Sequence, residues 1–200
     1  MDSVESFNQS FFLVLNGREG TPAWFVNTAI AVGDFLIYLV PVTLAWTWLS
    51  GGVSQRNLAL KVFAVVMLAV GVNQLIALVW QHPRPFMLGL GHAWIEHQAD
   101  SSFPSDHVTV LSGVGLTLLF SGATALAGLM LAFTVAVAWA RVFLGVHFPL
   151  DMVGAVIVSG MTLFLVSPLW NRFGPLLTDV SEKLYRKVFA WPISNGWMGR

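Results

Sequence analysis

Residues 108–140 read VTVLSGVGLTLLFSGATALAGLMLAFTVAVAWA and contain no charged side chain. A helix needs about 20 apolar residues to cross the hydrocarbon core of a bilayer, so this stretch is too long for a single crossing. The pair Ser121-Gly122 near its middle is typical of a turn. The stretch therefore predicts two membrane-spanning helices, and it indicates lipid as the surrounding solvent.

The composition of the whole chain agrees with this interpretation. Of 200 residues, 56% are hydrophobic and 10% are charged, whereas soluble domains average roughly 25% charged residues. Ten Lys and Arg balance ten Asp and Glu, so no basic surface suggests nucleic acid as a partner, and no obligate protein partner is evident. The chain has no cysteine, which excludes disulfides, thiolate catalysis and cysteine-based metal sites.

Three more crossings are predicted, over residues 24–49, 62–80 and 150–170. Pro168, Trp170 and Arg172 mark the point where the last span is expected to leave the membrane for a polar tail. Residues 4–16 predict an amphipathic helix at the membrane surface. The expected fold is all-α: one membrane-embedded bundle over residues 1–200, with about five transmembrane helices and this N-terminal helix.

The basic residues indicate how the bundle is oriented, because Lys and Arg are enriched in cytoplasmic loops. Five crossings put seven of them on one side: Arg56, Lys61, Arg172, Lys183, Arg186, Lys187 and Arg200. The other side has Arg18, Arg84 and Arg141. The C-terminus is therefore expected in the cytoplasm, and the long segment 81–106 on the outer face.

Three segments that are expected at this outer face carry the polar residues of interest. Residues 81–86 read QHPRPF, residues 101–107 read SSFPSDH and residues 140–151 read ARVFLGVHFPLD. Phosphoryl transfer requires cations and donors around the nonbridging oxygens, an in-line nucleophile and an acid for the leaving oxygen. These segments contain a candidate for each requirement.

Arg84 and Arg141 are candidate substrate-binding residues, because each guanidinium can bind two phosphate oxygens at once. Ser105 can add a hydrogen bond at a predicted helix start, where free N–H groups favour an anion. His147 and Asp151 are four residues apart, so the carboxylate can fix the tautomer of the imidazole and make His147 the nucleophile.

His107 is then the candidate general acid that protonates the leaving phosphate oxygen. The catalytic residues are therefore expected to be His147, His107 and Asp151, with a phosphohistidine as the intermediate. Asp106, between Ser105 and His107, is included among the residues expected to contact the substrate.

The three segments resemble the signature motifs of the type 2 phosphatidic acid phosphatase superfamily. Its pattern is Lys-x6-Arg-Pro, then Pro-Ser-Gly-His, then Ser-Arg-x5-His-x3-Asp. Here Arg84-Pro85, Pro104 to His107, and Arg141 to Asp151 occupy these positions in the same order. The resemblance implies a bundle of transmembrane helices, the same roles for the residues named above, and no metal or other cofactor.

The chain departs from this pattern at three positions. Ala77 stands in place of the lysine, Asp106 in place of the glycine and Ala140 in place of the serine. Without the lysine one phosphate contact is lost, which His82, His92 or His97 can partly replace. The Asp106 carboxylate would repel phosphate unless it turned away.

With these departures the chain is similar to the bacterial undecaprenyl pyrophosphate phosphatases of the superfamily. The resemblance implies hydrolysis of undecaprenyl diphosphate, a membrane lipid, to the monophosphate and inorganic phosphate. This reaction recycles the carrier lipid of peptidoglycan synthesis at the bacterial inner membrane, and it is linked to bacitracin resistance.

Other interpretations are possible at this stage. The phosphoryl group can pass to lipid A instead of water, or the substrate can be phosphatidylglycerophosphate or phosphatidic acid. A small transporter is a third possibility, in which Asp34, Asn73 and Gln74 line a path through the membrane. Otherwise these three residues are expected to hydrogen-bond to one another across helices. A zinc site at His92, His97 and Asp100 is disfavoured by the spacing of these residues.

Overall fold

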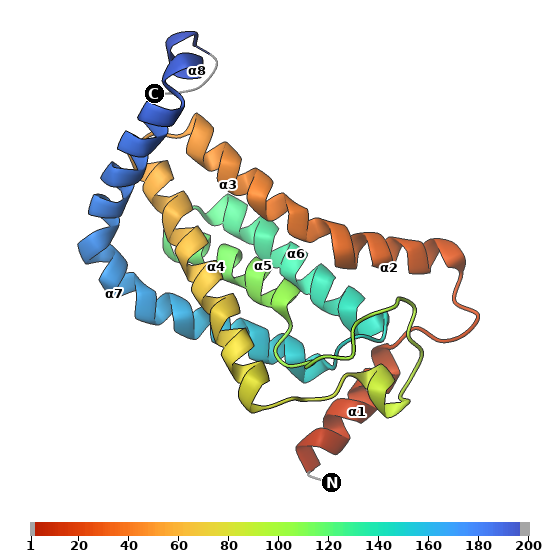
Figure 1. Cartoon of the computed structure of the whole chain (residues 1–200). Coiled ribbons are helices and arrows are strands. Elements are labelled where there is room, and N and C mark those ends of the chain that lie inside the picture. The colour runs from red at the N-terminus through yellow and green to blue at the C-terminus, as the bar shows by residue number, and fades with distance from the viewer. Residues whose placement is uncertain (1–2, 197–200) are drawn as a thin grey trace.

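The uncharged stretch folds as two helices, α5 (Asp106–Phe120) and α6 (Thr124–Phe143), in a computed structural model that describes residues 3–196. The predicted break at Ser121-Gly122 is confirmed, because Gly122 takes a φ of 84°, a left-handed conformation that glycine adopts without steric cost. All regular elements within residues 3–196 are helical. The predicted all-α membrane bundle is therefore confirmed (Figure 1).

Helix α5 occupies the centre of the bundle, where α4 (Val53–Val79), α6 and α7 (Pro149–Val188) pack around it. Small residues allow this close packing: a Cβ at Gly115 would lie 2.7 Å from Leu131 Cδ2. The Ser112 hydroxyl donates to Ser159 Oγ of α7 at 2.9 Å, across the interface. With 15 residues, α5 is only about 22 Å long, less than the hydrocarbon thickness of roughly 30 Å. Its neighbours shield this short helix from lipid.

Within residues 3–196, four helical segments are long and apolar enough to cross a membrane by themselves: Ala23–Ser50, Val53–Val79, Thr124–Phe143 and Pro149–Val188. The first consists of α2 (Ala23–Phe35), the 3₁₀ turn η1 (Leu36–Tyr38) and α3 (Leu39–Ser50). Pro41 has no N–H to donate to the Ile37 carbonyl, which accounts for the tightened turn before it. The predicted helix 4–16 is present as α1 (Ser3–Leu15), with Asn8 and Phe12 buried.

Two helices extend beyond their predicted ends. The helix predicted to begin at residue 62 begins at Val53, because Arg56 is buried among protein groups and is not exposed to lipid. The last helix does not end near Arg172 but continues through Pro168 and Pro175 to Val188. Figure 1 shows that α7 bends along its length, as expected for a helix with internal prolines.

The far end of α7 is helical because one of its faces packs against α4 and α3. Asn57 donates to Thr178 Oγ1 at 2.7 Å and accepts from Trp170 Nε1 at 3.1 Å. Arg56 pairs with Glu182 at 3.4 Å and donates to the Trp48 carbonyl at 3.1 Å. The predicted polar tail is therefore part of the bundle. Arg200, which was counted in the charge balance, lies outside the described residues.

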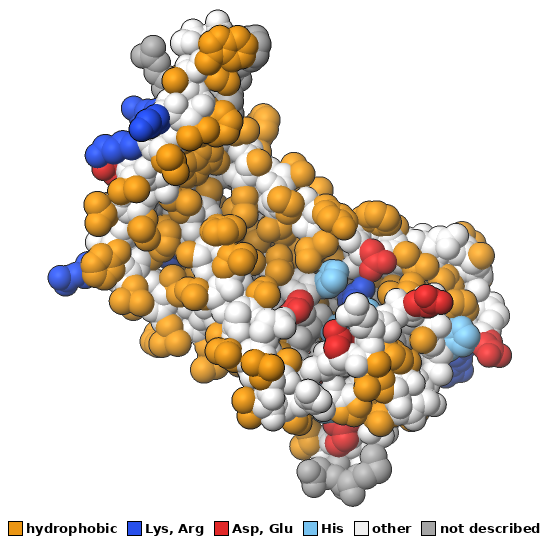
Figure 2. All heavy atoms as spheres, in the orientation of Figure 1, with side chains coloured by type: hydrophobic (Ala, Val, Ile, Leu, Met, Phe, Trp, Pro, Cys, Tyr) orange, Lys and Arg blue, Asp and Glu red, His pale blue; other side chains and the backbone are white. Residues whose placement is uncertain are grey.

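The two ends of the bundle differ in chemistry. The C-terminal ends of α4 and α6 and the N-terminal ends of α5 and α7 meet at one end, where α1 and the loop with η2 (Pro85–Leu88) also lie (Figure 1). Figure 2 shows lysine and arginine side chains near the opposite end, and histidine and acidic side chains at the first end. We call the first end the polar end. All three signature segments lie there.

Replacing Arg56 by alanine tests how α4 and the far end of α7 are held together. Removing this buried cation leaves Glu182 with only the exposed Arg186 as a partner, and breaking a buried ion pair typically costs about 3–5 kcal/mol. We expect the unfolding midpoint in detergent to fall by about 5 °C or more. Arg172→Ala is the control, because Arg172 is exposed; equal midpoints for the two variants would contradict this role of Arg56.

Candidate active site

His147 lies in the turn between α6 and α7, and its two ring nitrogens have different neighbours. Nε2 is 3.1 Å from Arg84 Nη1, and Nδ1 is 3.2 Å from Asp151 Oδ2. A guanidinium only donates hydrogen bonds, so Nε2 must accept this one through its lone pair. Nδ1 then carries the proton and donates it to the carboxylate. The two contacts together select the tautomer with its lone pair on Nε2, where Arg84 donates to it.

Burial keeps this ring neutral. His147 is 3% exposed, and burial together with the nearby Arg84 and Arg141 guanidinium groups holds the pKa of His147 well below its ordinary value. A neutral imidazole has an electron pair for attack, whereas an imidazolium has none. The electrostatics of the site therefore favour the same state of the ring as its hydrogen bonds do.

Asp151 is buried behind His147, in the first turn of α7. Its Oδ2 accepts a hydrogen bond from the Phe148 amide at 2.8 Å and another from the Ser102 hydroxyl. The carboxylate thus caps its own helix and holds His147 at the same time. Ser102 also lies 3.4 Å from His147 Nδ1. Its hydroxyl was not predicted as a site residue, because only the folded loop brings it to Asp151.

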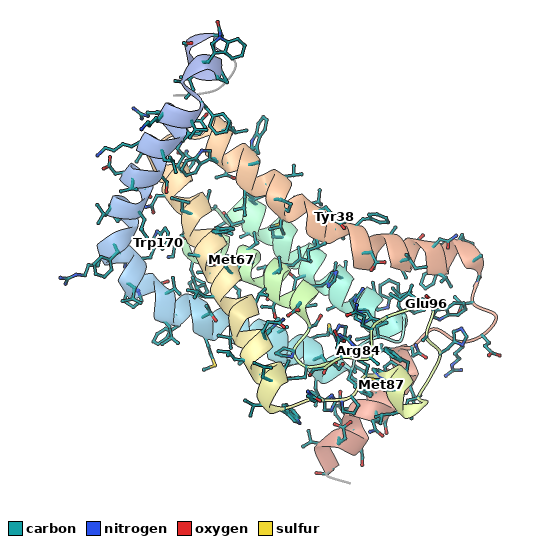
Figure 3. The ribbon with its side chains drawn as sticks, in the orientation of Figure 1. Tyr38, Met67, Arg84, Met87, Glu96 and Trp170 are labelled. Carbon is teal, nitrogen blue, oxygen red and sulfur yellow. The ribbon has the colours of Figure 1, made fainter. Side chains whose placement is uncertain are left out.

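Arg84 joins the loop after α4 to the other two signature segments. It donates to the Val146 carbonyl at 2.9 Å, to the Ser101 carbonyl at 3.2 Å and to Asp100 Oδ1 at 2.7 Å. It is 5% exposed. These acceptors keep the charged group in a fixed position, which a flexible surface arginine would not have. Figure 3 labels Arg84 at the polar end of the bundle.

Arg141 approaches the same region from the last turn of α6, and its side chain is 3% exposed. Its Nη1 donates to Asp34 Oδ1 of α2 at 2.8 Å. Asp34, for which a transport role was considered, is therefore the partner of a buried arginine. The Nε of Arg141 has no partner among the described residues, so this guanidinium keeps a donor for a ligand.

Asp106 is held by the two amides whose role the sequence left open. Asn73 Nδ2 donates to Asp106 Oδ1 at 2.7 Å, and Gln74 Nε2 donates to Oδ2 at 3.2 Å. The prediction that Asp34, Asn73 and Gln74 bond to one another is wrong, because both amides donate to Asp106 of α5, whereas Asp34 accepts from Arg141. Both oxygens of Asp106 thus face α4, at a point one helical turn before Ala77 along that helix.

A cavity of about 210 Å³ lies between these groups. Its walls include the predicted site residues Arg84, Asp106, His107, Arg141 and His147, together with Asn73, Gln74, Ala77, His97, Asp100, Ser101, Phe103 and Pro104. Ser105 is fully buried at the start of α5, and its Oγ has no partner among the described residues. Asp151 lies behind His147. The fold brings all seven predicted residues to one place.

The turn that carries His147 is fixed against the loop over the cavity. Gly145 has a φ of 83°, and a Cβ there would lie 2.3 Å from the His92 carbonyl oxygen. Asn16, just after α1, donates to the carbonyls of His92 and Phe143, both at 2.9 Å. Glycine is therefore required at residue 145 by both its conformation and this close approach.

The three histidines considered as substitutes for the lysine lie in different places. His82 pairs with Glu5 of α1 at 3.5 Å, and His92 pairs with Glu19 at 3.9 Å. His97 lines the cavity, with its ring centroid 6.4 Å from that of His147. Among the described residues, no group of three or more histidines and carboxylates has the arrangement of a metal site.

Comparison with known proteins gives the family. Residues 58–175 match the PAP2 superfamily. The chain belongs to this superfamily. YbjG of Escherichia coli (strain K12), whose name gives it provisionally as an undecaprenyl-diphosphatase, is 33% identical over 98% of both chains. The undecaprenyl-diphosphatase BcrC of Bacillus subtilis (strain 168) is 27% identical over 95% of this chain and 100% of its own.

Two crystal structures have the same fold. A PAP2-type phosphatidylglycerolphosphate phosphatase from Bacillus subtilis superposes with a TM-score of 0.65 at 19% identity, covering 86% of this chain and 88% of its own. LpxE from Aquifex aeolicus gives a TM-score of 0.62 at 16% identity, covering 80% and 93%. At these identities the likeness concerns the fold, and this chain is a multi-pass membrane protein of that fold.

The amides that hold Asp106 give a test of the cavity as an anion site. In Asn73→Ala the Asp106 carboxylate loses its closest donor and can turn toward the cavity. Repulsion between this carboxylate and the phosphate analogue orthovanadate should then raise the constant for inhibition of phosphatase activity by orthovanadate about tenfold. Adding Asp106→Asn to this variant should restore inhibition, since the charge is gone. Unchanged inhibition in Asn73→Ala would contradict this role of the amide.

Proposed function

We propose that the protein hydrolyses undecaprenyl diphosphate to undecaprenyl phosphate and inorganic phosphate through a phosphohistidine on His147. The observation that carries this proposal is the tautomer of His147, which Asp151 and Arg84 fix with its lone pair on Nε2, at the wall of a polar cavity. The names of the two relatives that cover nearly the whole chain support the choice of lipid.

In the first step Arg84 Nη1 exchanges its hydrogen bond to His147 Nε2 for one to a nonbridging oxygen, and Nε2 attacks the terminal phosphorus. A bond forms between nitrogen and phosphorus, and the bond from phosphorus to the bridging oxygen breaks. Arg84 and Arg141 bind the nonbridging oxygens, where negative charge is distributed in the transition state. His107, in the first turn of α5, donates a proton to the leaving oxygen of the lipid phosphate. Asp151 stabilises the positive charge on the His147 ring.

In the second step water attacks the phosphohistidine. His107, now neutral, takes a proton from the water as its oxygen bonds to phosphorus and the nitrogen–phosphorus bond breaks. Inorganic phosphate leaves, and both histidines return to their starting states. The Ser105 hydroxyl, which has no partner among the described residues, and the N–H groups at the start of α5 would bind the phosphate in either step.

The lipid substrate has a route to the cavity along α4. A second cavity of about 510 Å³ shares Gln74, Ala77, Asp100 and Ser101 with the first one. Leu78, which also lines it, is 77% exposed and would face the hydrocarbon of a bilayer. A diphosphate headgroup can therefore reach His147 while its chain stays in lipid on the side of α4.

The surplus of basic residues at the end opposite the cavity supports an outward-facing site and a cytoplasmic C-terminus. For a bacterial inner membrane the cavity would then face the periplasm. There the enzyme would recycle the carrier lipid of peptidoglycan synthesis. An enzyme that competes for undecaprenyl diphosphate in this way would also give tolerance to bacitracin.

The proposal is tested by phosphate release from undecaprenyl diphosphate in detergent with EDTA. Wild type should be active. His147→Ala should lose activity by about 10³-fold or more, because no other group replaces the nucleophile. Loss of wild-type activity in EDTA would contradict a metal-independent reaction.

Other results of the same assay test the choice of lipid substrate and of water as the phosphoryl acceptor. If wild type released phosphate from phosphatidic acid or phosphatidylglycerophosphate but not from undecaprenyl diphosphate, the chemistry would stand and the substrate would be wrong. If added lipid A gained a phosphoryl group, detected by its mass, transfer to lipid would replace hydrolysis. If wild type released phosphate from none of these lipids, the proposed function would be wrong.

A further inference from the structure

The cavity around His147 has too little fixed positive charge for the ligand it is proposed to bind. Its charged wall residues are two arginines, Arg84 and Arg141, and two aspartates, Asp100 and Asp106, so their formal charges cancel. Ala77 adds no cation from α4. A terminal phosphate with two negative charges needs a further positive group, and the histidines are the remaining candidates among the wall residues.

Two of the three histidines in this wall are committed to other roles. His147 must stay neutral to attack, and His107 gives its proton, and with it its positive charge, to the leaving group. His97 is left. It lies on the loop between η2 and α5, and its side chain is 23% exposed. No part of the proposed reaction has used it.

The contacts of His97 leave one ring nitrogen for a ligand. Its Nδ1 lies 3.2 Å from the Gln98 carbonyl oxygen and 3.9 Å from Asp100 Oδ1. Asp100 in turn accepts from Arg84 Nε. The other nitrogen, Nε2, has no hydrogen bond to any group within residues 3–196. The ring is thus attached on one side to the network of Arg84, with a free nitrogen on the other.

We propose that His97 is a substrate-binding residue that takes up a proton with the phosphate and donates a hydrogen bond to it from Nε2. This inference rests on the proposed function. His97 then supplies the positive charge that Ala77 does not. His97 reaches the cavity from the loop between η2 and α5, whereas the lysine of the superfamily pattern would reach it from residue 77 of α4.

The charges around His97 explain why its proton comes with the ligand. Burial and, next, the charge of Arg84 lower the pKa of His97; the Gln98 carbonyl opposes them, and Arg141 (lowering) and Asp100 (raising) have smaller effects. The net shift is downward, so the ring is neutral in the empty cavity. His107 and His147 also face it. A phosphate dianion among these groups has the opposite effect and favours the imidazolium. The proton comes from solvent, and it leaves again with the product.

The test is calorimetric titration of the full chain in detergent with orthovanadate. Titrations in two buffers of different ionisation enthalpy give the number of protons taken up. Wild type should take up close to one proton more per vanadate than His97→Gln, which can donate a hydrogen bond but cannot be protonated. The dissociation constant should rise about tenfold in His97→Ala and less in His97→Gln.

His92→Ala is the matched control, because His92 lies on the same loop but its ring packs on Trp94, with centroids 4.4 Å apart. It should bind vanadate as wild type does. Equal affinity and equal proton uptake in wild type and both His97 variants would overturn the role of His97 alone. If wild type did not bind vanadate, the phosphate site itself, and with it the proposed function, would be contradicted.

Discussion

The contact of Arg84 with His147 is the interaction on which the rest of the polar end depends. A guanidinium cannot lose its charge in a protein, so burying one requires acceptors on every side. Here the acceptors come from segments far apart in the sequence: Asp100 and Ser101 before α5, and Val146 and His147 before α7. Satisfying one buried charge therefore assembles the loops, and it also sets the tautomer of the histidine.

A second constraint is the membrane itself. Because lipid cannot satisfy polar groups, the bundle gathers them at its ends or pairs them inside. Arg141 has Asp34, Arg56 has Glu182, and Asp106 has the amides of Asn73 and Gln74. Such pairs are easily taken for transport or catalytic groups in a sequence. In this fold their first effect is to hold helices together around a cavity that is itself polar.

Much of the fold could be predicted, because hydropathy reports directly on contact with lipid. The break at Ser121-Gly122 and the helix over residues 4–16 were predicted with nearly their observed bounds. The ends of α4 and α7 were not, since Arg56 and residues beyond Arg172 read as polar, whereas the structure satisfies them by packing the two helices together. Hydropathy cannot distinguish a residue in water from one that is buried with a partner.

The candidate site likewise has residues that could be predicted from the sequence and residues that could not. The motifs contain five residues of the cavity wall, with Ser105 and Asp151 next to it, so residue types and order were sufficient to predict that these seven lie together. Ser102 and Asp34 were not assigned to the site, because their contacts join segments whose approach depends on the whole bundle. The most direct test of the central claim is to find which residue carries the phosphoryl group, using peptide mass spectrometry after an alkaline quench of wild type turning over undecaprenyl diphosphate. The account predicts phosphohistidine at His147; a phosphoryl group on His107 or Ser105 instead would contradict it.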